Sequence, residues 1–233
     1  MYWSAHALYR VGSTPDLQDA LQILDQIKQK YPNSRLRNSQ NDVASLQIRI
    51  AGVLSSRGQG GSDIVKRALA QNTSVCDTEE AQVRSAALNA LMQTDPDAAT
   101  QYATKILARK DECSRDLRRN ALFLIGERRG NSGAVSAGAT ATLISVAKSD
   151  PSPDVRQTAV SFLGRLQNDD ALAALEELMK TSDDQGVQRE AIRSLARNSN
   201  PRARAGIKAL VERNDASESL RITALDESGR AHV

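Results

Sequence analysis

One apolar pattern recurs along this chain at intervals of 32 to 38 residues. In the stretch PDVRQTAVSFLGRL, Val155 is followed by apolar residues four, five and eight positions later. These offsets place the side chains on one face of a helix. The same offsets follow four other anchor residues, and the last copy ends in Ser228: Val83, Leu117, Val187 and Leu220. A period of this size predicts helical repeats that stack on one another.

A second amphipathic segment lies between successive anchors, at residues 97–109, 138–148, 169–180 and 201–213. Three helix starts are marked by a capping residue before a proline: Asp95-Pro96, Ser152-Pro153 and Asn200-Pro201. Each repeat is therefore expected to be a helical hairpin, which buries its apolar face only by stacking on its neighbours. Only 3% of the residues are aromatic, and no segment alternates as a strand does. We expect an all-α chain.

Three positions in the repeat have expected roles. Alanine stands four residues after the anchor in all five copies, where a small side chain lets two helices approach closely. Glycine stands nine residues after it in three copies, where we expect it to end the helix in the left-handed conformation: Gly126, Gly164 and Gly229. Arginine follows the anchor in four copies, and we assign this ladder to packing between repeats: Arg84, Arg118, Arg156 and Arg221.

The order Asp154-Val155-Arg156, followed by Ala159-Val160 and Leu163-Gly164, resembles the HEAT repeat. The short spacing resembles the bacterial HEAT-like type that also occurs in phycobilisome lyase proteins. The resemblance covers about residues 78–233. It implies a right-handed, armadillo-like α-solenoid (an α-α superhelix) of about five repeats, the last incomplete. In such arrays the second helices line the concave face.

The N-terminal part has a different pattern. Residues 16–30 present Leu17, Ala20, Leu21, Leu24 and Ile27 on one helical face. Ala20, Leu24 and Ile27 ahead of Pro32 resemble the second helix of a tetratricopeptide (TPR) hairpin. The glycine- and serine-rich stretch SSRGQGGS at residues 55–62 is typical of a linker. We expect a TPR-like segment at residues 1–57, a linker with a short helix at 58–75 and the HEAT-like array at 76–233. Because both ends of the chain stop in mid-pattern, we expect it to be part of a longer protein.

The two cysteines leave two alternatives open. Cys76 and Cys113 each precede the first helix of a repeat, and the two repeats are adjacent. They would form either a disulfide across one edge of the solenoid or two unpaired thiols. A disulfide would favour an oxidising compartment such as the periplasm; otherwise the compartment of this soluble chain is unknown. The chain has no stretch of about 18 apolar residues that would span a membrane.

No residue set predicts catalysis. The two histidines, His6 and His232, have no partner at a useful spacing, and no CxxC motif occurs. Adjacent carboxylates such as Asp169-Asp170 and Glu176-Glu177 fit helix starts or solvent-facing positions, and nothing pairs them into a general acid/base site. We therefore expect no catalytic residue, no metal, no cofactor and no enzymatic activity.

Basic residues carry the remaining functional signal. They crowd residues 109–129, and a second set lies on the last second helix: Arg202, Arg204, Lys208 and Arg213. The leading hypothesis is a scaffold that binds a protein or peptide partner on the concave face, with an oligomeric state that the sequence leaves unknown. The alternative is nucleic-acid binding through the arginine-rich repeats. A continuous basic stripe across several second helices would favour nucleic acid, whereas a mixed-sign or apolar surface would favour a protein partner.

Overall fold

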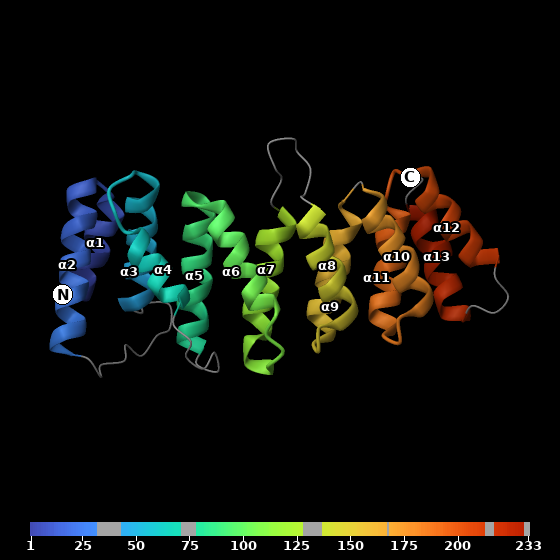
Figure 1. The fold of residues 1–233 in the computed structure, drawn as a ribbon, viewed down its shortest axis with the longest axis horizontal. Helices are drawn as coiled ribbons and strands as arrows, with labels where there is room; N and C mark the ends of the chain where they lie inside the picture. The colour runs from blue at the N-terminus through green and yellow to red at the C-terminus, as the bar shows by residue number, and fades with distance from the viewer. Residues whose placement is uncertain (32–42, 71–77, 128–136, 167, 213–216, 231–233) are drawn as a thin grey trace. The chain divides into compact units, whose positions relative to one another are not determined.

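The computed structural model describes residues 1–31, 43–70, 78–127, 137–166, 168–212 and 217–230, and every regular element within these ranges is a helix (Figure 1). The α-helices are α1 (Tyr2–Val11), α2 (Thr14–Lys30), α3 (Val43–Ser56), α4 (Ser62–Ala70), α5 (Thr78–Thr94), α6 (Pro96–Leu107), α7 (Arg115–Glu127), α8 (Ala137–Ser149), α9 (Pro153–Gly164), α10 (Asp169–Thr181), α11 (Gln185–Ala196), α12 (Pro201–Glu212) and α13 (Glu218–Arg230). A short 3₁₀ helix, η2 (Glu112–Ser114), precedes α7. The all-α prediction is confirmed, and the four expected second segments are α6, α8, α10 and α12.

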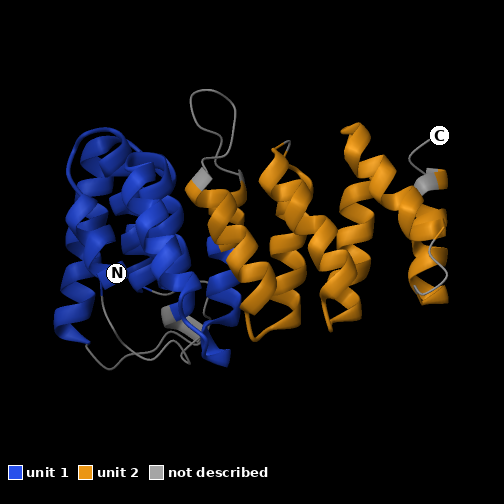
Figure 2. Cartoon of the chain, turned by 45° about the vertical axis from the view of Figure 1, so that its right-hand side comes forward, with its two compact units in different colours: residues 1–121 blue, residues 122–233 orange. Residues whose placement is uncertain are grey.

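The helices form two compact units, residues 1–121 and 122–233, and the division falls inside α7 (Figure 2). None of the described helices is both long and apolar enough to cross a membrane. The domain limits expected at residues 57 and 75 remain predictions.

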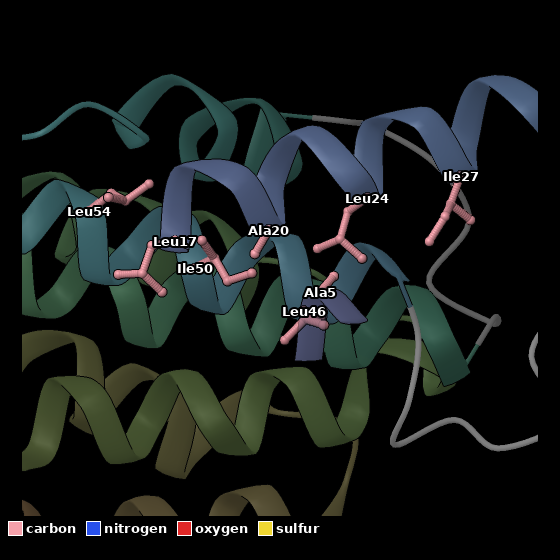
Figure 3. Packing of buried hydrophobic residues seen from close by; sticks show 8 residues of the cluster. All are labelled: Ala5, Leu17, Ala20, Leu24, Ile27, Leu46, Ile50 and Leu54. Atoms are coloured by element: carbon pink, nitrogen blue, oxygen red, sulfur yellow. The ribbon is translucent and has the colours of Figure 1, made fainter. Parts of the chain in front are cut away.

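The N-terminal core of the first unit is built by the face predicted for α2. Leu17, Ala20, Leu24 and Ile27 are buried there (Figure 3). They pack with Ala5 of α1 and with three residues of α3: Leu46, Ile50 and Leu54. Leu21, which the sequence placed on the same face, is half-buried at the edge of this cluster.

The glycine-rich stretch forms a tight turn between α3 and α4. Gly58, Gly60 and Gly61 all have positive φ. A Cβ on Gly61 would lie 2.4 Å from the carbonyl oxygen of Ala51, so this position has no room for a side chain. The turn holds α4 against α3 and α5.

The second unit has two layers. The first helices α9, α11 and α13 pack in sequence along one layer, and the second helices α8, α10 and α12 pack along the other. The anchors Val155 and Val187 are fully buried, as are the alanines four residues later, Ala159 and Ala191. The last copy differs, because Ala224 is buried while Leu225 is 55% exposed.

The structure corrects the role that we expected for the repeat glycines. Gly126, Gly164 and Gly229 lie within α7, α9 and α13, and none is among the described residues with positive φ. Gly126 instead faces the ring of Phe162, and Gly164 faces Ser194. At these two positions the missing side chain permits close helix contact rather than a left-handed helix end.

The three predicted helix starts are present, with one difference in detail. The side chain of Asp95 accepts a hydrogen bond from the backbone N–H of Ala98, and that of Asn200 accepts one from Arg202. Ser152 occupies the N-cap position of α9, but its side chain makes no capping bond. Its backbone N–H donates to the carboxylate of Asp150 at 2.9 Å.

Candidate binding surface on the second helices

Ion pairs join the second helices of the second unit to one another. Lys148 of α8 donates through Nζ to both carboxylate oxygens of Glu177 on α10, at 2.8 and 2.7 Å. Arg202 of α12 donates through Nε and Nη2 to the two oxygens of Glu176, each at 3.0 Å. We call these four residues the ion-pair ladder. Along the ladder, a basic residue of α8 is followed by two acidic residues of α10 and then by a basic residue of α12.

On each of the three helices, a small exposed side chain stands three positions from a ladder residue. Residues three or four positions apart on a helix share a face. Ser145 of α8, Ala173 of α10 and Ala205 of α12 stand in this relation to Lys148, Glu176 and Arg202, and all three are exposed. The exposed side of α8, α10 and α12 therefore combines fixed charges of both signs with positions where a partner's chain can approach closely. We call this side the second-helix surface; Figure 1 labels the three helices that carry it.

The structure separates the four basic residues that the sequence singled out on α12. Arg202 is held by Glu176, and the hydrogen bond between them raises the pKa of the Arg202 guanidinium. Lys208 lies 3.8 Å from Glu212 of its own helix, and both side chains are exposed. Arg204 is exposed as well. Arg213 lies outside the described residues.

The basic cluster in the first unit is also interleaved with acids. Arg109 pairs with Asp111 at 3.1 Å. Arg115 contacts Glu112 at 3.0 Å, and Arg119 lies 3.7 Å from Asp116. In both units, many of the described basic side chains therefore stand beside acidic ones.

Three arginines of the predicted ladder hydrogen-bond to a backbone carbonyl in the last turn of the preceding helix or in the segment that follows it. Arg118, which is fully buried, donates to the carbonyl oxygen of Asp111 and to Ser114 Oγ, both at 2.6 Å. Arg156 donates to the carbonyl of Asp150 at 2.6 Å, and Arg221 donates to that of Val211 at 3.1 Å. A cation near the carboxyl end of a helix is favourable. These bonds support the packing role that we propose for the ladder.

The fourth arginine of that series, Arg84 of α5, is only 5% exposed and lines a cavity in the first unit. Gln188 takes the place of arginine in the copy on α11, and its backbone N–H donates to the carbonyl of Asp184 at 3.0 Å.

Arg156 also joins two neighbouring repeats. Its Nη2 lies 2.6 Å from Asp184 Oδ2, at the start of α11. Asp184 caps that helix by accepting from the backbone N–H groups of Gly186 and Val187. Partial burial opposes ionisation of Asp184, but the hydrogen bonds from Arg156 and from the helix start outweigh it, so the pKa of this carboxyl is lowered. Asp111 has a lowered pKa for the same balance of causes, with Arg109 and Ser114 as its donors.

The remaining candidates do not form a site in the described part of the chain. His6 lies among Tyr2, Trp3 and Tyr9 on α1, and His232 is outside the described residues. No cluster of three metal-ligating side chains occurs within the described ranges. Cys113 lies exposed in η2, whereas Cys76 is outside the described residues. The disulfide therefore stays a prediction, which mass spectrometry of unreduced, alkylated peptides would test.

Comparison with known proteins agrees with this geometry. Residues 106–196 match a family model described as HEAT repeats. The chain contains HEAT repeats. A comparison with curated proteins finds no match. Among solved structures, the X-ray structure of the Escherichia coli protein YibA is 20% identical, with a TM-score of 0.52 over 97% of this chain and 74% of that one. This likeness shows a shared fold.

A designed armadillo repeat protein in complex with the peptide (KR)4 is also similar, at 18% identity and a TM-score of 0.49 over 99% of each chain. The phycobilisome-lyase type of HEAT repeat is not confirmed by these matches. The TPR-like character of the N-terminal helices also stays an expectation.

The acidic half of the ion-pair ladder was missed by sequence reasoning. Glu176 and Glu177 have the pattern of ordinary solvent-facing residues of α10, and their partners stand 26 and 29 residues away on other second helices. The repeat register gives no signal for these pairs. When the second helices are aligned by their anchors, Glu176 stands opposite Lys208 and not opposite Arg202.

Proposed function

We propose that this chain is a non-enzymatic scaffold that binds a protein or peptide segment across its second-helix surface. The observation that carries the proposal is the ion-pair ladder, in which acidic Glu176 and Glu177 lie between Lys148 and Arg202. A peptide that carries both signs of charge can form ion pairs with the ladder residues in place of the pairs that they make with one another. Each charge of the ladder then still has an opposite charge beside it. Stacked helical repeats provide extended surfaces of this kind.

The same surface is less suited to binding a nucleic acid. A phosphate backbone needs several cations that are available for neutralisation. Here Arg202 and Lys148 are already engaged by carboxylates, and those carboxylates would repel phosphates. The inference from fold to binding function rests on analogy of architecture, so the test must distinguish the two ligand classes directly.

A single substitution distinguishes peptide binding from nucleic-acid binding. Ala173→Arg adds both bulk and positive charge to the exposed side of α10. If a peptide binds there, the substitution blocks it; if nucleic acid binds there, the added charge strengthens it. Gln185→Arg places the same charge on α11, a first helix, and serves as the matched control because Gln185 is also exposed.

The experiment uses peptides selected from a random phage-displayed library against the whole chain, together with a labelled DNA duplex. Binding of both is measured by fluorescence anisotropy at low and near-physiological salt. We expect the selected peptides to lose at least about tenfold in affinity with Ala173→Arg, which corresponds to about 1.4 kcal/mol, and to be unaffected by Gln185→Arg. Failure to enrich any peptide, or salt-sensitive duplex binding that Ala173→Arg strengthens, would contradict the proposal.

A further inference from the structure

A cavity of about 370 Å³ lies in the first unit, and its described lining comes from α2, α3, α4 and α5. This volume falls within the range of sites that hold small organic ligands. The lining combines charged side chains of both signs with apolar ones. The second-helix surface belongs to the other unit, so a ligand of this cavity is separate from the partner proposed above.

Three charged side chains line the cavity, and among the described contacts of the chain none of them has an ion-pair partner. Asp25 and Lys28 belong to α2, where they stand three residues apart and therefore share one face of the helix. Arg67 belongs to α4, and its described bond is a donation to the backbone carbonyl of Asp63 at 3.3 Å. The cavity thus offers one negative and two positive charges that a ligand can pair.

The carboxylate of Asp25 is oriented by a buried amide. Gln47 of α3 is 4% exposed, and its Nε2 donates to Asp25 Oδ1 at 2.6 Å. Among the described bonds, neither the second oxygen of Asp25 nor the amide oxygen of Gln47 accepts from another donor. These two acceptors suit an ammonium group, which has three donors and no acceptor.

The rest of the described lining is apolar and includes a position that other repeats bury. Ile48 of α3 and Ile64 of α4 contribute to it, together with Val83 of α5. Val83 is the first anchor of the repeat pattern, and it is only half-buried. The next three anchors are 0% or 1% exposed: Leu117, Val155 and Val187. An apolar group in the cavity would cover Val83 and Ile64 and gain the free energy of burial.

We propose that this cavity binds a free α-amino acid with an apolar side chain. Its ammonium group pairs with Asp25, its carboxylate pairs with Lys28 and Arg67, and its side chain lies against Ile64 and Val83. Residues three apart on a helix have Cβ atoms about 5–6 Å apart, a spacing that two charged groups on one carbon can bridge. A carboxylic acid would set a negative charge beside Asp25, and an amine would set a positive charge beside Lys28 and Arg67. Like charges that face each other cost binding free energy, so the zwitterion fits best.

Isothermal titration calorimetry of the whole chain with L-leucine tests the proposal. Asp25→Asn and Lys28→Gln are the test variants, since both side chains are exposed and neither replacement empties the core. We expect each to weaken leucine binding about tenfold, the loss typical of one charge-assisted hydrogen bond. Asp19→Asn and Lys30→Gln are the matched controls, because they make the same changes at exposed positions of α2 outside the lining. Both controls should leave the affinity unchanged.

Three comparison ligands test the three parts of the site. N-acetyl-L-leucine lacks the ammonium charge, L-leucinamide lacks the carboxylate and glycine lacks the apolar side chain, so each should bind at least about tenfold more weakly than L-leucine. Equal binding of N-acetyl-L-leucine or L-leucinamide would mean that the cavity takes one end of a polypeptide, and the proposal would be wrong. Absence of leucine binding at millimolar concentration, or an equal loss in the control variants, would also overturn it.

Discussion

Among single residues, the arginine that follows four of the five anchors has the most unusual position, because in two copies, Arg84 and Arg118, it buries a charged side chain. Arg118 is fully buried, and its guanidinium donates to a backbone carbonyl and to Ser114. We predict that Arg118→Ala lowers the free energy of unfolding by about 2–4 kcal/mol, because a charged hydrogen-bond donor is lost and truncation of this fully buried side chain leaves a cavity. Urea denaturation measures this loss.

The next residue in the chain is the control. Arg119 is exposed, and the carboxylate of Asp116, which lies 3.7 Å from its guanidinium, is exposed as well. Arg119→Ala should change stability by no more than about 0.5 kcal/mol. Equal effects of the two substitutions would show that Arg118 does not stabilise the repeat through its buried bonds.

Asp184 makes stability depend on pH. Its pKa in the folded chain is lowered, against the effect of burial, by Arg156 and by the amides of α11. A carboxyl whose folded pKa lies below its unfolded value of about 3.9 stabilises the fold above that pH, and the contribution is lost as pH falls through the folded pKa. We predict that Asp184→Asn costs about 1–2 kcal/mol at pH 7.

The cost of Asp184→Asn should shrink below about pH 4, where the wild-type carboxyl also becomes neutral. Thermal unfolding measured between pH 3 and 7 provides the test. Asp183→Asn, at the exposed neighbouring position, should leave the profile unchanged. A penalty for Asp184→Asn that stays constant down to pH 3 would refute the assignment.

Between helices, the glycine nine residues after the anchor permits close contact in two repeats, at Gly126 and Gly164. A Cβ on Gly126 would lie 2.3 Å from Phe162 Cδ1, and one on Gly164 would lie 2.5 Å from Ser194 Cβ. Alanine at either position must push the helices apart, and we predict a loss of about 1–3 kcal/mol in unfolding free energy. Chemical denaturation of each variant measures it.

Gly229 has the same position in its repeat but a different surrounding. Among the described residues beyond its own stretch of helix, no atom lies within 4 Å of the place that a Cβ would take. Gly229→Ala should therefore be neutral or stabilising by up to about 1 kcal/mol, because alanine favours the helix. Destabilisation of all three variants to the same extent would mean that helix contact is not what selects glycine here.

The periodicity of the sequence predicted the interior of the helices well. The alanines four residues after the five anchors are all 0% exposed: Ala87, Ala121, Ala159, Ala191 and Ala224. Burial follows the helical period, so a local pattern is sufficient to find it. The backbone acceptors of Arg156 and Arg221 and the partner of Arg202 could not be found in this way. They depend on the course of the loops and on the register between helices, which no local pattern encodes.

For the chain as a whole, exposed ion pairs contribute little to stability. It carries 31 basic and 28 acidic residues. Many of the described pairs are solvent-exposed, including Lys148 with Glu177, whose side chains are 40% and 52% exposed. Exposed pairs of this kind contribute about 0–1 kcal/mol each. The ion-pair ladder is therefore better suited to recognising a partner than to holding the repeats together, which is the task of the buried apolar faces.

Because stability resides in apolar contacts between neighbouring repeats, unfolding of the chain should not be a single transition. Trp3 is the only tryptophan, and in α1 its ring meets those of Tyr2 and His6 at 5.5 and 5.9 Å. Its fluorescence follows the unfolding of the first unit, whereas far-UV circular dichroism follows the loss of all helices. We predict that the two signals have different midpoints in urea.

Two matched core truncations make this prediction sharper. Leu24 in the first unit and Leu163 in the second are both 0% exposed. Each Leu→Ala change should cost about 2–5 kcal/mol, but Leu24→Ala should move the Trp3 transition, and Leu163→Ala should move only the transition seen by circular dichroism. Coincident curves that shift together in both variants would instead mean that all the repeats unfold as one cooperative body.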